Sequence, residues 1–409
     1  MKKMIPLMLI ACLLLGGLVG YLRYQGGTAP ETAAPAPAPE APAETAAPAP
    51  APDIQMEDMD YETLDIKRLR AAHDPQETVL SVDGKAESWG DYFYFLASQI
   101  NEMERLLVRY YANYGAELLW SDTADADGNT FADLALSGAE KGLLQLTAIE
   151  GFAAENAVEL TEESRQDMAR QLASDMKAYC GEAAMETAFD AYLAAHDMNR
   201  SLYDRILMSQ ALYREGFHRL YGDGGELLEE ETALRYLEDN GYISANHILL
   251  ATVDPLTGEK LEEAVIAEKA DAARRLAAEL QAIEDPAERL QRFAQFKEAY
   301  CEDAGKTIYP EGYTFTPHTM AADFERVCKE LEPYAVSDPV QSNYGYHIIM
   351  KLPPDADALL FNSSGDPITA RAAAASIEYD ERLQAYTDGL KMEYAEGFEK
   401  PNLLDYING

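Results

Sequence analysis

Residues 336–351 read VSDPVQSNYGYHIIMK, and this stretch decides the fold. Two mainly apolar runs, 336–340 and 345–350, flank a short polar segment, which is the pattern of two strands around a turn. A third strand is predicted at 243–250 (ISANHILL), where alternation puts Ile243, Ala245, His247 and Leu249 on one face. The sequence therefore predicts a small antiparallel sheet built from segments that are far apart in the chain.

Helical patterns occupy the sequence between these strands. Apolar spacing predicts helices at about 261–283 and 287–300, followed by a loop at 301–306 and then Gly312-Tyr-Thr-Phe315. A further helix carries Met320, Phe324, Val327 and Leu331 on one stripe. The order β-α-α-α-β-β predicts an α+β domain at residues 242–353, with helices packed on the sheet.

Three stretches of this domain resemble the parvulin-type (PpiC) rotamases, which are peptidyl-prolyl cis/trans isomerases. They are NHILL at 246–250, the helix that carries Met320 and Phe324-Glu325, and VSDPVQSNYGYHIIMK at 336–351. The resemblance covers about 242–353 and is greatest to the rotamases of PrsA-type foldases and of the chaperone SurA. It implies a parvulin fold and isomerisation of X–Pro bonds, with no metal or cofactor.

The resemblance also implies site residues. His247 and His347 match the paired histidines that the family carries on neighbouring central strands, and Asp303 stands where the family has an Asp or Cys facing the substrate proline. We expect these three residues to be catalytic.

A second group of residues matches the family's apolar proline pocket. Met320 and Phe324 correspond to its walls, and Phe315 has the expected spacing before them. The family's Gly-Asp-Leu-Gly turn is replaced by residues 311–314, so Tyr313 is expected to supply the wall that Leu provides elsewhere. Ser342 and Tyr344 occupy positions that are often Thr and Ser, so hydrogen bonding around His347 is expected to differ.

Prolyl isomerisation makes few chemical demands on a protein. Rotation about the bond faces a barrier near 20 kcal/mol and takes tens of seconds unaided, but no bond breaks. A dry slot for the proline ring and polar groups that favour the twisted amide are sufficient. A single histidine on an apolar strand face is more often a core residue than a catalytic one. The prediction therefore depends on the combined match of both histidines, Asp303, Met320 and Phe324 to the family. A catalytically inactive holdase that binds unfolded secreted polypeptides remains the alternative.

The N-terminus predicts the compartment. Lys2 and Lys3 precede an apolar run at 4–22 that ends at Arg23, long enough to span a bilayer as a helix. The lysines predict a single-pass anchor (1–26) in the cell membrane, with the bulk outside the cytoplasm. A cleaved signal peptide and a lipoprotein anchored at Cys12 are alternatives. Residues 27–56, rich in Ala and Pro, predict a disordered linker.

The remaining sequence is mainly helical. Asp83-Gly84 predicts a hairpin turn, and amphipathic patterns predict a helix after it and others at about 131–157, 162–180, 183–195, 198–221 and 229–239. We expect residues 57–241 to form a SurA/PrsA-like helical chaperone domain. A helix predicted at 368–395, within 354–409, is expected to pack back on that domain, as the resemblance implies.

Charge limits the possible partners. The chain has 33 Lys+Arg against 72 Asp+Glu, a formal net charge of −39, which repels nucleic acid and anionic lipid. Contact with the membrane is therefore expected only through the N-terminal apolar segment. Unfolded or nascent secreted polypeptides with X–Pro bonds are the expected partners. The sequence does not specify an oligomeric state, and it leaves a Cys301–Cys328 bridge open, although plain thiols are favoured.

Overall fold

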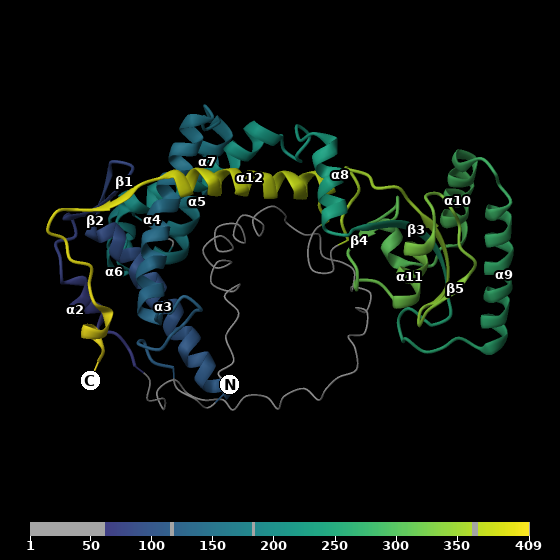
Figure 1. Ribbon diagram of the computed structural model, residues 1–409, viewed down its shortest axis with the longest axis horizontal. Helices are drawn as coiled ribbons and strands as arrows, with labels where there is room; N and C mark the ends of the chain where they lie inside the picture. The colour runs from purple at the N-terminus through teal and green to yellow at the C-terminus, as the bar shows by residue number, and fades with distance from the viewer. Residues whose placement is uncertain (1–61, 115–117, 182–184, 362–366, 409) are drawn as a thin grey trace. The chain divides into compact units, whose positions relative to one another are not determined.

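The computed structural model describes residues 62–114, 118–181, 185–361 and 367–408. They divide into two compact units (Figure 1). We call the unit formed by the described residues up to 219 and from 380 onward the helical unit, and residues 220–379 the sheet unit. The predicted anchor (1–26) and linker (27–56) lie outside the described residues. Within the described ranges, none of the helices combines the length and apolar character needed to cross a bilayer.

The sheet unit contains a four-stranded sheet in the order β4-β3-β6-β5. Every neighbouring pair is antiparallel. The strands are β3 (Ile243–Ala251), β4 (Tyr313–Phe315), β5 (Val340–Gln341) and β6 (Gly345–Lys351). The predicted α+β class with a small antiparallel sheet is therefore confirmed for this part of the chain.

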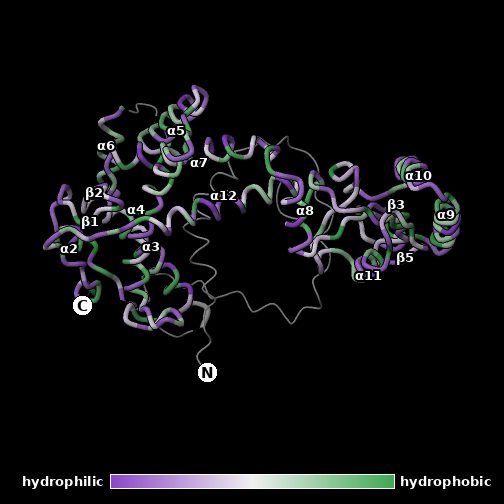
Figure 2. Tube along the Cα trace, turned by 45° about the horizontal axis from the view of Figure 1, so that its top comes forward, coloured by the Kyte–Doolittle hydropathy of each residue, from purple (hydrophilic) through white to green (hydrophobic). Residues whose placement is uncertain are grey.

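Helices cover both faces of this sheet. α9 (Glu263–Gln281) and α10 (Pro286–Tyr300) pack on one face, over Ile248 and Ile348, and α11 (Ala322–Glu330) packs on the other, over Ile349. Figure 1 shows α11 and α9 on opposite sides of β3. Side chains alternate along β3 and β6, so each strand supplies both clusters. Figure 2 shows apolar and polar residues mixed along α9, as expected for a helix with one buried face.

Three details of this unit differ from the prediction. Gly312-Tyr-Thr-Phe contains the strand β4, which was not predicted. The strand predicted at 336–340 is reduced to β5, because Pro339 has no N–H to donate; upstream of it only Val336 forms a bridge, to Met350. α11 is shorter than the predicted stripe, so Met320 lies just before it.

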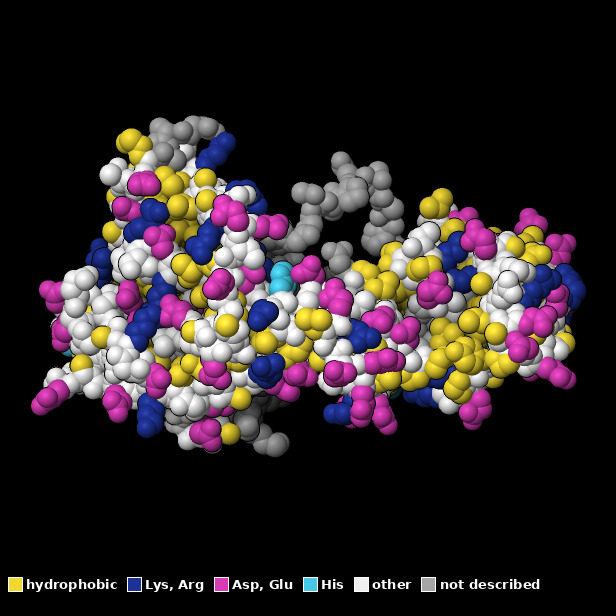
Figure 3. Space-filling model, turned by 90° about the horizontal axis from the view of Figure 1, so that it is seen from above, with side chains coloured by type: hydrophobic (Ala, Val, Ile, Leu, Met, Phe, Trp, Pro, Cys, Tyr) yellow, Lys and Arg dark blue, Asp and Glu magenta, His cyan; other side chains and the backbone are white. Residues whose placement is uncertain are grey.

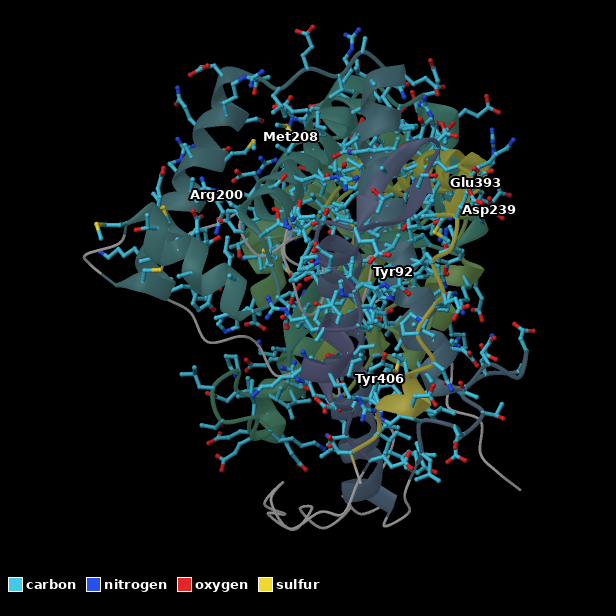
Figure 4. All side chains as sticks on the ribbon, turned by 90° about the vertical axis from the view of Figure 1, so that its left-hand side faces the viewer. Tyr92, Arg200, Met208, Asp239, Glu393 and Tyr406 are labelled. Atoms are coloured by element: carbon cyan, nitrogen blue, oxygen red, sulfur yellow. The ribbon has the colours of Figure 1, made fainter. Side chains whose placement is uncertain are left out.

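The helical unit is built around two long helices. α3 (Trp89–Tyr114) and α4 (Phe131–Glu155) pack along one another and bury the core that contains Tyr92 (Figure 4). α4 begins at a capping box, in which Thr130 and Asp133 bond each other's backbone N–H groups. The helical unit also contains α2 (Ile66–Arg70), α5 (Glu162–Cys180) and α6 (Glu186–Ala195), whereas α8 (Glu230–Asp239) belongs to the sheet unit. The helices α7 (Arg200–Tyr221) and α12 (Ala370–Gly389) each have residues in both units.

The helical unit also contains a three-stranded sheet in the order β2-β1-β7. β1 (Thr78–Val82) and β2 (Lys85–Ser88) form a hairpin whose turn residues Asp83 and Gly84 both have positive φ, which confirms the turn prediction. β7 (Met392–Tyr394) pairs with β1. The helix predicted at 368–395 is therefore wrong at its end: α12 stops at Gly389, because pairing with β1 overrides the weak local helical preference.

A buried ion-pair network supports the helical unit and yields a stability prediction. Arg205 bonds Glu87, Glu150 and Thr147, with an Arg205 Nη1 to Glu87 Oε2 distance of 2.7 Å, and the Glu87 side chain is only 2% exposed. Arg205→Ala leaves Glu87 buried without its partner, so we expect it to lower the free energy of unfolding by about 3–5 kcal/mol.

Urea unfolding followed by circular dichroism measures this loss. Arg105→Ala is the matched control, because Arg105 and its partner Glu102 are both exposed and 3.8 Å apart; it should change stability by at most about 0.5 kcal/mol. Equal effects of the two substitutions would show that the buried network of Arg205 stabilises the fold no more than an exposed ion pair does.

Candidate active site

Two buried histidines lie side by side on the central strands of the sheet unit. β3 and β6 pair so that His247 is opposite Ile349 and Leu249 is opposite His347. The two histidines are thus diagonal neighbours on one face, with ring centroids 5.2 Å apart and planes at 82°. They are 8% and 6% exposed.

Aromatic side chains enclose this pair. The ring of Phe324, from α11, meets both histidines edge-on, at centroid distances of 5.4 Å to His247 and 5.5 Å to His347. Phe315, on β4, lies 6.0 Å from Phe324. Met320 is partly buried and packs against the same apolar cluster. The histidines therefore share one apolar environment with these three residues, which are among those predicted to form the proline pocket.

Asp303 reaches the same site from the loop after α10. It caps the 3₁₀ helix η2 (Ala304–Thr307), and its Oδ1 accepts the N–H of Gly305 at 3.2 Å. Its Oδ2 accepts the Tyr313 hydroxyl at 2.6 Å and lies 3.4 Å from His247 Nε2. A Cβ at position 305 would collide with the Tyr313 hydroxyl, so this approach requires glycine.

The electrostatics of this site keep Asp303 ionised. Burial by itself would raise the pKa of Asp303, but His247, the Tyr313 hydroxyl and the Gly305 N–H together outweigh it and hold that pKa well below its usual range. Burial and the neighbouring Asp303 carboxylate raise the pKa of Tyr313. Tyr313 therefore remains a hydrogen-bond donor, and its ring stacks on His247 at a centroid distance of 5.5 Å.

His347 is held as a neutral ring. Burial, followed by the proximity of His247, lowers the pKa of His347 to about 3 against a smaller opposing effect of Asp303. Its Nε2 lies 2.7 Å from the Ser342 hydroxyl, which also accepts the Tyr344 N–H at 3.1 Å. This hydrogen bond fixes the orientation of the ring.

Three polar atoms of the histidine pair have no hydrogen-bond partner among the described residues. They are Nδ1 of His347 and both ring nitrogens of His247, whose 3.4 Å approach to Asp303 lacks hydrogen-bond geometry. Unsatisfied buried polar atoms are uncommon in proteins. Three of them in one apolar pocket are therefore a distinguishing property of this site.

The structure brings most of the sequence-predicted site residues together, with one exception. The residues in contact with the pair or its cluster are Asp303, Tyr313, Phe315, Met320, Phe324 and Ser342. Tyr344 is the exception: its side chain packs against the cluster beneath α9 and α10, and its backbone N–H is what contacts Ser342. Position in a motif did not reveal which face this side chain would occupy.

Two supporting residues were missed by the sequence analysis. Lys297 is buried and donates to the carbonyls of Tyr309 (3.1 Å) and Pro310 (2.7 Å), which fixes the turn before Tyr313. Cys301 lies beneath β3, its Sγ 3.8 Å from the His247 carbonyl oxygen; it is a free thiol, as is Cys328. Neither residue forms a local pattern, since each acts through a contact distant in the sequence.

The low pKa of His347 gives a pH prediction. The unfolded chain protonates this histidine below about pH 6.5, whereas the folded protein keeps it neutral to about pH 3. The free energy of unfolding should therefore fall by about 1.4 kcal/mol for each pH unit below about pH 6.5, until the folded protein also protonates His347. Acidification from pH 7 to pH 5 should therefore lower the free energy of unfolding by about 2 kcal/mol through His347.

Urea unfolding of the wild type and of His347→Gln at both pH values tests this prediction. The variant should lose about 2 kcal/mol less than the wild type on acidification. The depressed pKa of Asp303 does not interfere, because its contribution is lost only below about pH 4. The same pH dependence in both proteins would show that His347 is not held neutral.

Comparison with known proteins identifies the fold around this site. Residues 247–352 match the family model for the rotamase PPIC-type PPIASE domain. No curated protein matches the chain at a significant level. Similar solved structures include PrsA from Bacillus subtilis (15% identity, 64% of this chain and 88% of that one, TM-score 0.25). Another comes from the SurA-like chaperones PEB4 and Cj1289 of Campylobacter jejuni (15%, 76% and 94%, TM-score 0.22).

The family match identifies the domain that contains this site. That match spans β3 to β6 and includes both histidines, Asp303 and the aromatic pocket. The chain therefore contains a rotamase domain of the PpiC type, at residues 247–352.

Proposed function

We propose that this protein is an active peptidyl-prolyl cis/trans isomerase that assists the folding of secreted proteins. The observation that carries the proposal is the buried pair His247 and His347, lined by Phe324 and placed beside the ionised Asp303. Apolar walls suit a proline ring, and unpartnered polar atoms suit the amide next to it. Together these two features suit a site that accelerates rotation about an X–Pro bond.

The proposed mechanism is electrostatic. Conjugation in the planar amide adds partial negative charge to the carbonyl oxygen and partial positive charge to nitrogen, and twisting reduces both. A carboxylate beside that oxygen disfavours the planar form, and more strongly in a dry site than in water. Asp303 is proposed to act in this way. The histidines are proposed to orient the site without transferring protons, consistent with the neutral ring of His347.

The proposed location is outside the cytoplasmic membrane. The support is the apolar run at 4–22 after two lysines and the Ala/Pro-rich segment that follows it. Acidic side chains are spread over the visible face of both units in Figure 3, in keeping with the net charge of −39. We propose unfolded secreted polypeptides as partners, with basic segments favoured by this charge.

A holdase is the second candidate, and one feature of the helical unit favours it. Large apolar side chains are exposed near the end of α5 and at the start of α6: Tyr179 is 55% exposed and Met185 is 64% exposed. Met168 and Met176 on α5 are only partly buried. Yellow side chains gather on these helices in Figure 3 (upper left). Flexible methionines and exposed aromatic rings suit the binding of varied apolar segments.

The isomerase proposal predicts that catalysis depends on Asp303. Asp303→Ala in the full-length chain should lower kcat/KM for X–Pro peptides about 100-fold, because it removes the carboxylate that disfavours the planar amide. Exchange spectroscopy on short peptides with varied residues before proline measures the rate. Asp271→Ala, an exposed change on α9, should leave the rate unaltered. A folded wild-type protein without catalysis would refute the proposal.

The holdase candidate predicts a separable activity. Replacing Tyr179 and Met185 together by serine should weaken the suppression of aggregation of an unfolded protein, because these side chains offer apolar surface. Isomerisation of short peptides should not change, since neither residue lies in the rotamase domain. Light scattering measures the first activity. Unaltered suppression would remove α5 and α6 as the binding surface.

A further inference from the structure

A buried carboxylate adjoins the pocket residue Phe324 in the chain and takes no part in the proposed chemistry. Glu325, on α11, is 5% exposed. Its Oε1 accepts the backbone N–H groups of Thr319 and Met320, both at 2.8 Å, and its Oε2 accepts that of His318 at 3.0 Å. One side chain thus binds three consecutive amides of the segment that leads into its own helix.

These amides converge only because the segment is bent. His318 has a φ of +68°, which is unfavourable for a residue other than glycine. The residue before α11, Ala321, provides no side-chain cap. Hydrogen bonds to a carboxylate are stronger than those between neutral groups. Glu325 therefore stabilises both the bend and the start of the helix.

The segment held in this way connects two walls of the proposed proline pocket. Met320 donates its own N–H to Glu325, and Phe324 is the neighbour of Glu325 in the chain. Phe324 meets both histidines, and Met320 packs in the same cluster. Asp303 and the histidines come from other elements, so Glu325 supports only the apolar side of the site.

We propose that Glu325 is a positioning residue that fixes Met320 relative to Phe324 and so sets the fit of the pocket to the proline ring. This inference rests on the proposed isomerase function. Because Glu325 acts through Met320, it governs peptide binding and leaves the rate of rotation in the bound peptide unchanged.

A double-mutant cycle in the full-length chain tests the proposal. Glu325→Ala and Met320→Ala should each raise KM for X–Pro peptides about tenfold with kcat unchanged, and the double variant should be no worse than Met320→Ala alone. Glu325→Gln should recover much of the wild-type KM, since its amide oxygen can still accept from Thr319 and Met320. Additive effects, or a fall in kcat at constant KM, would overturn the proposal.

The methyl resonance of Met320 gives a readout that does not depend on catalysis. In ¹³C-methyl-methionine spectra it should shift in Glu325→Ala and return toward the wild-type position in Glu325→Gln. An unchanged resonance in Glu325→Ala would overturn the positioning role. If the wild type itself does not catalyse isomerisation, the proposed function fails, and this spectrum still decides whether Glu325 positions Met320.

Discussion

The antiparallel pairing of β3 with β6 is the interaction on which the site depends. It sets His247 opposite Ile349 and His347 opposite Leu249, so both rings project from one face of the sheet. A slip of one residue in either strand would turn one histidine into the cluster beneath α9 and α10. That exchange would bury an imidazole in the cluster that contains Phe293 and open a gap beside Phe324. The apolar clusters on the two faces therefore hold the register, and the register brings the histidines together.

Much of this arrangement follows from local sequence patterns. Alternation at 243–250 and the apolar run at 345–350 predicted the two strands, and Asp83-Gly84 predicted its hairpin, because each signal is contained in a few neighbouring residues. The helix predicted at 162–180 has those bounds in the structure, since Thr161 accepts the Ser164 N–H at its start and Gly181, with positive φ, follows its end. That the two histidines lie on neighbouring strands was implied by the resemblance to the rotamase family, and β3 and β6 do pair.

The contacts that complete the site do not follow from local sequence patterns. Asp303 meets Tyr313 across a loop whose path depends on the hydrogen bonds of Lys297, and a sequence does not reveal such a path. Tyr344 was assigned to the site by its place in a motif, yet its side chain belongs to the opposite face. Glu325 can bind three consecutive amides only because the backbone bends at His318, and the residue types in that segment do not predict the bend. In each case several local conformations are similar in energy, and tertiary packing determines which one the chain adopts.

The pairing of β7 with β1 has a consequence for the order in which the chain can mature. β1 has β2 as a neighbour from residue 88 onward, but its other edge pairs with β7, at residues 392–394. The sheet of the helical unit therefore stays incomplete until residue 394 has been made, whereas every strand of the rotamase domain is present by residue 351. During vectorial synthesis or export, the rotamase domain can thus be complete while an open strand edge persists in the segment that emerged before it. A protein proposed to assist the folding of secreted polypeptides would itself contain a late-folding part.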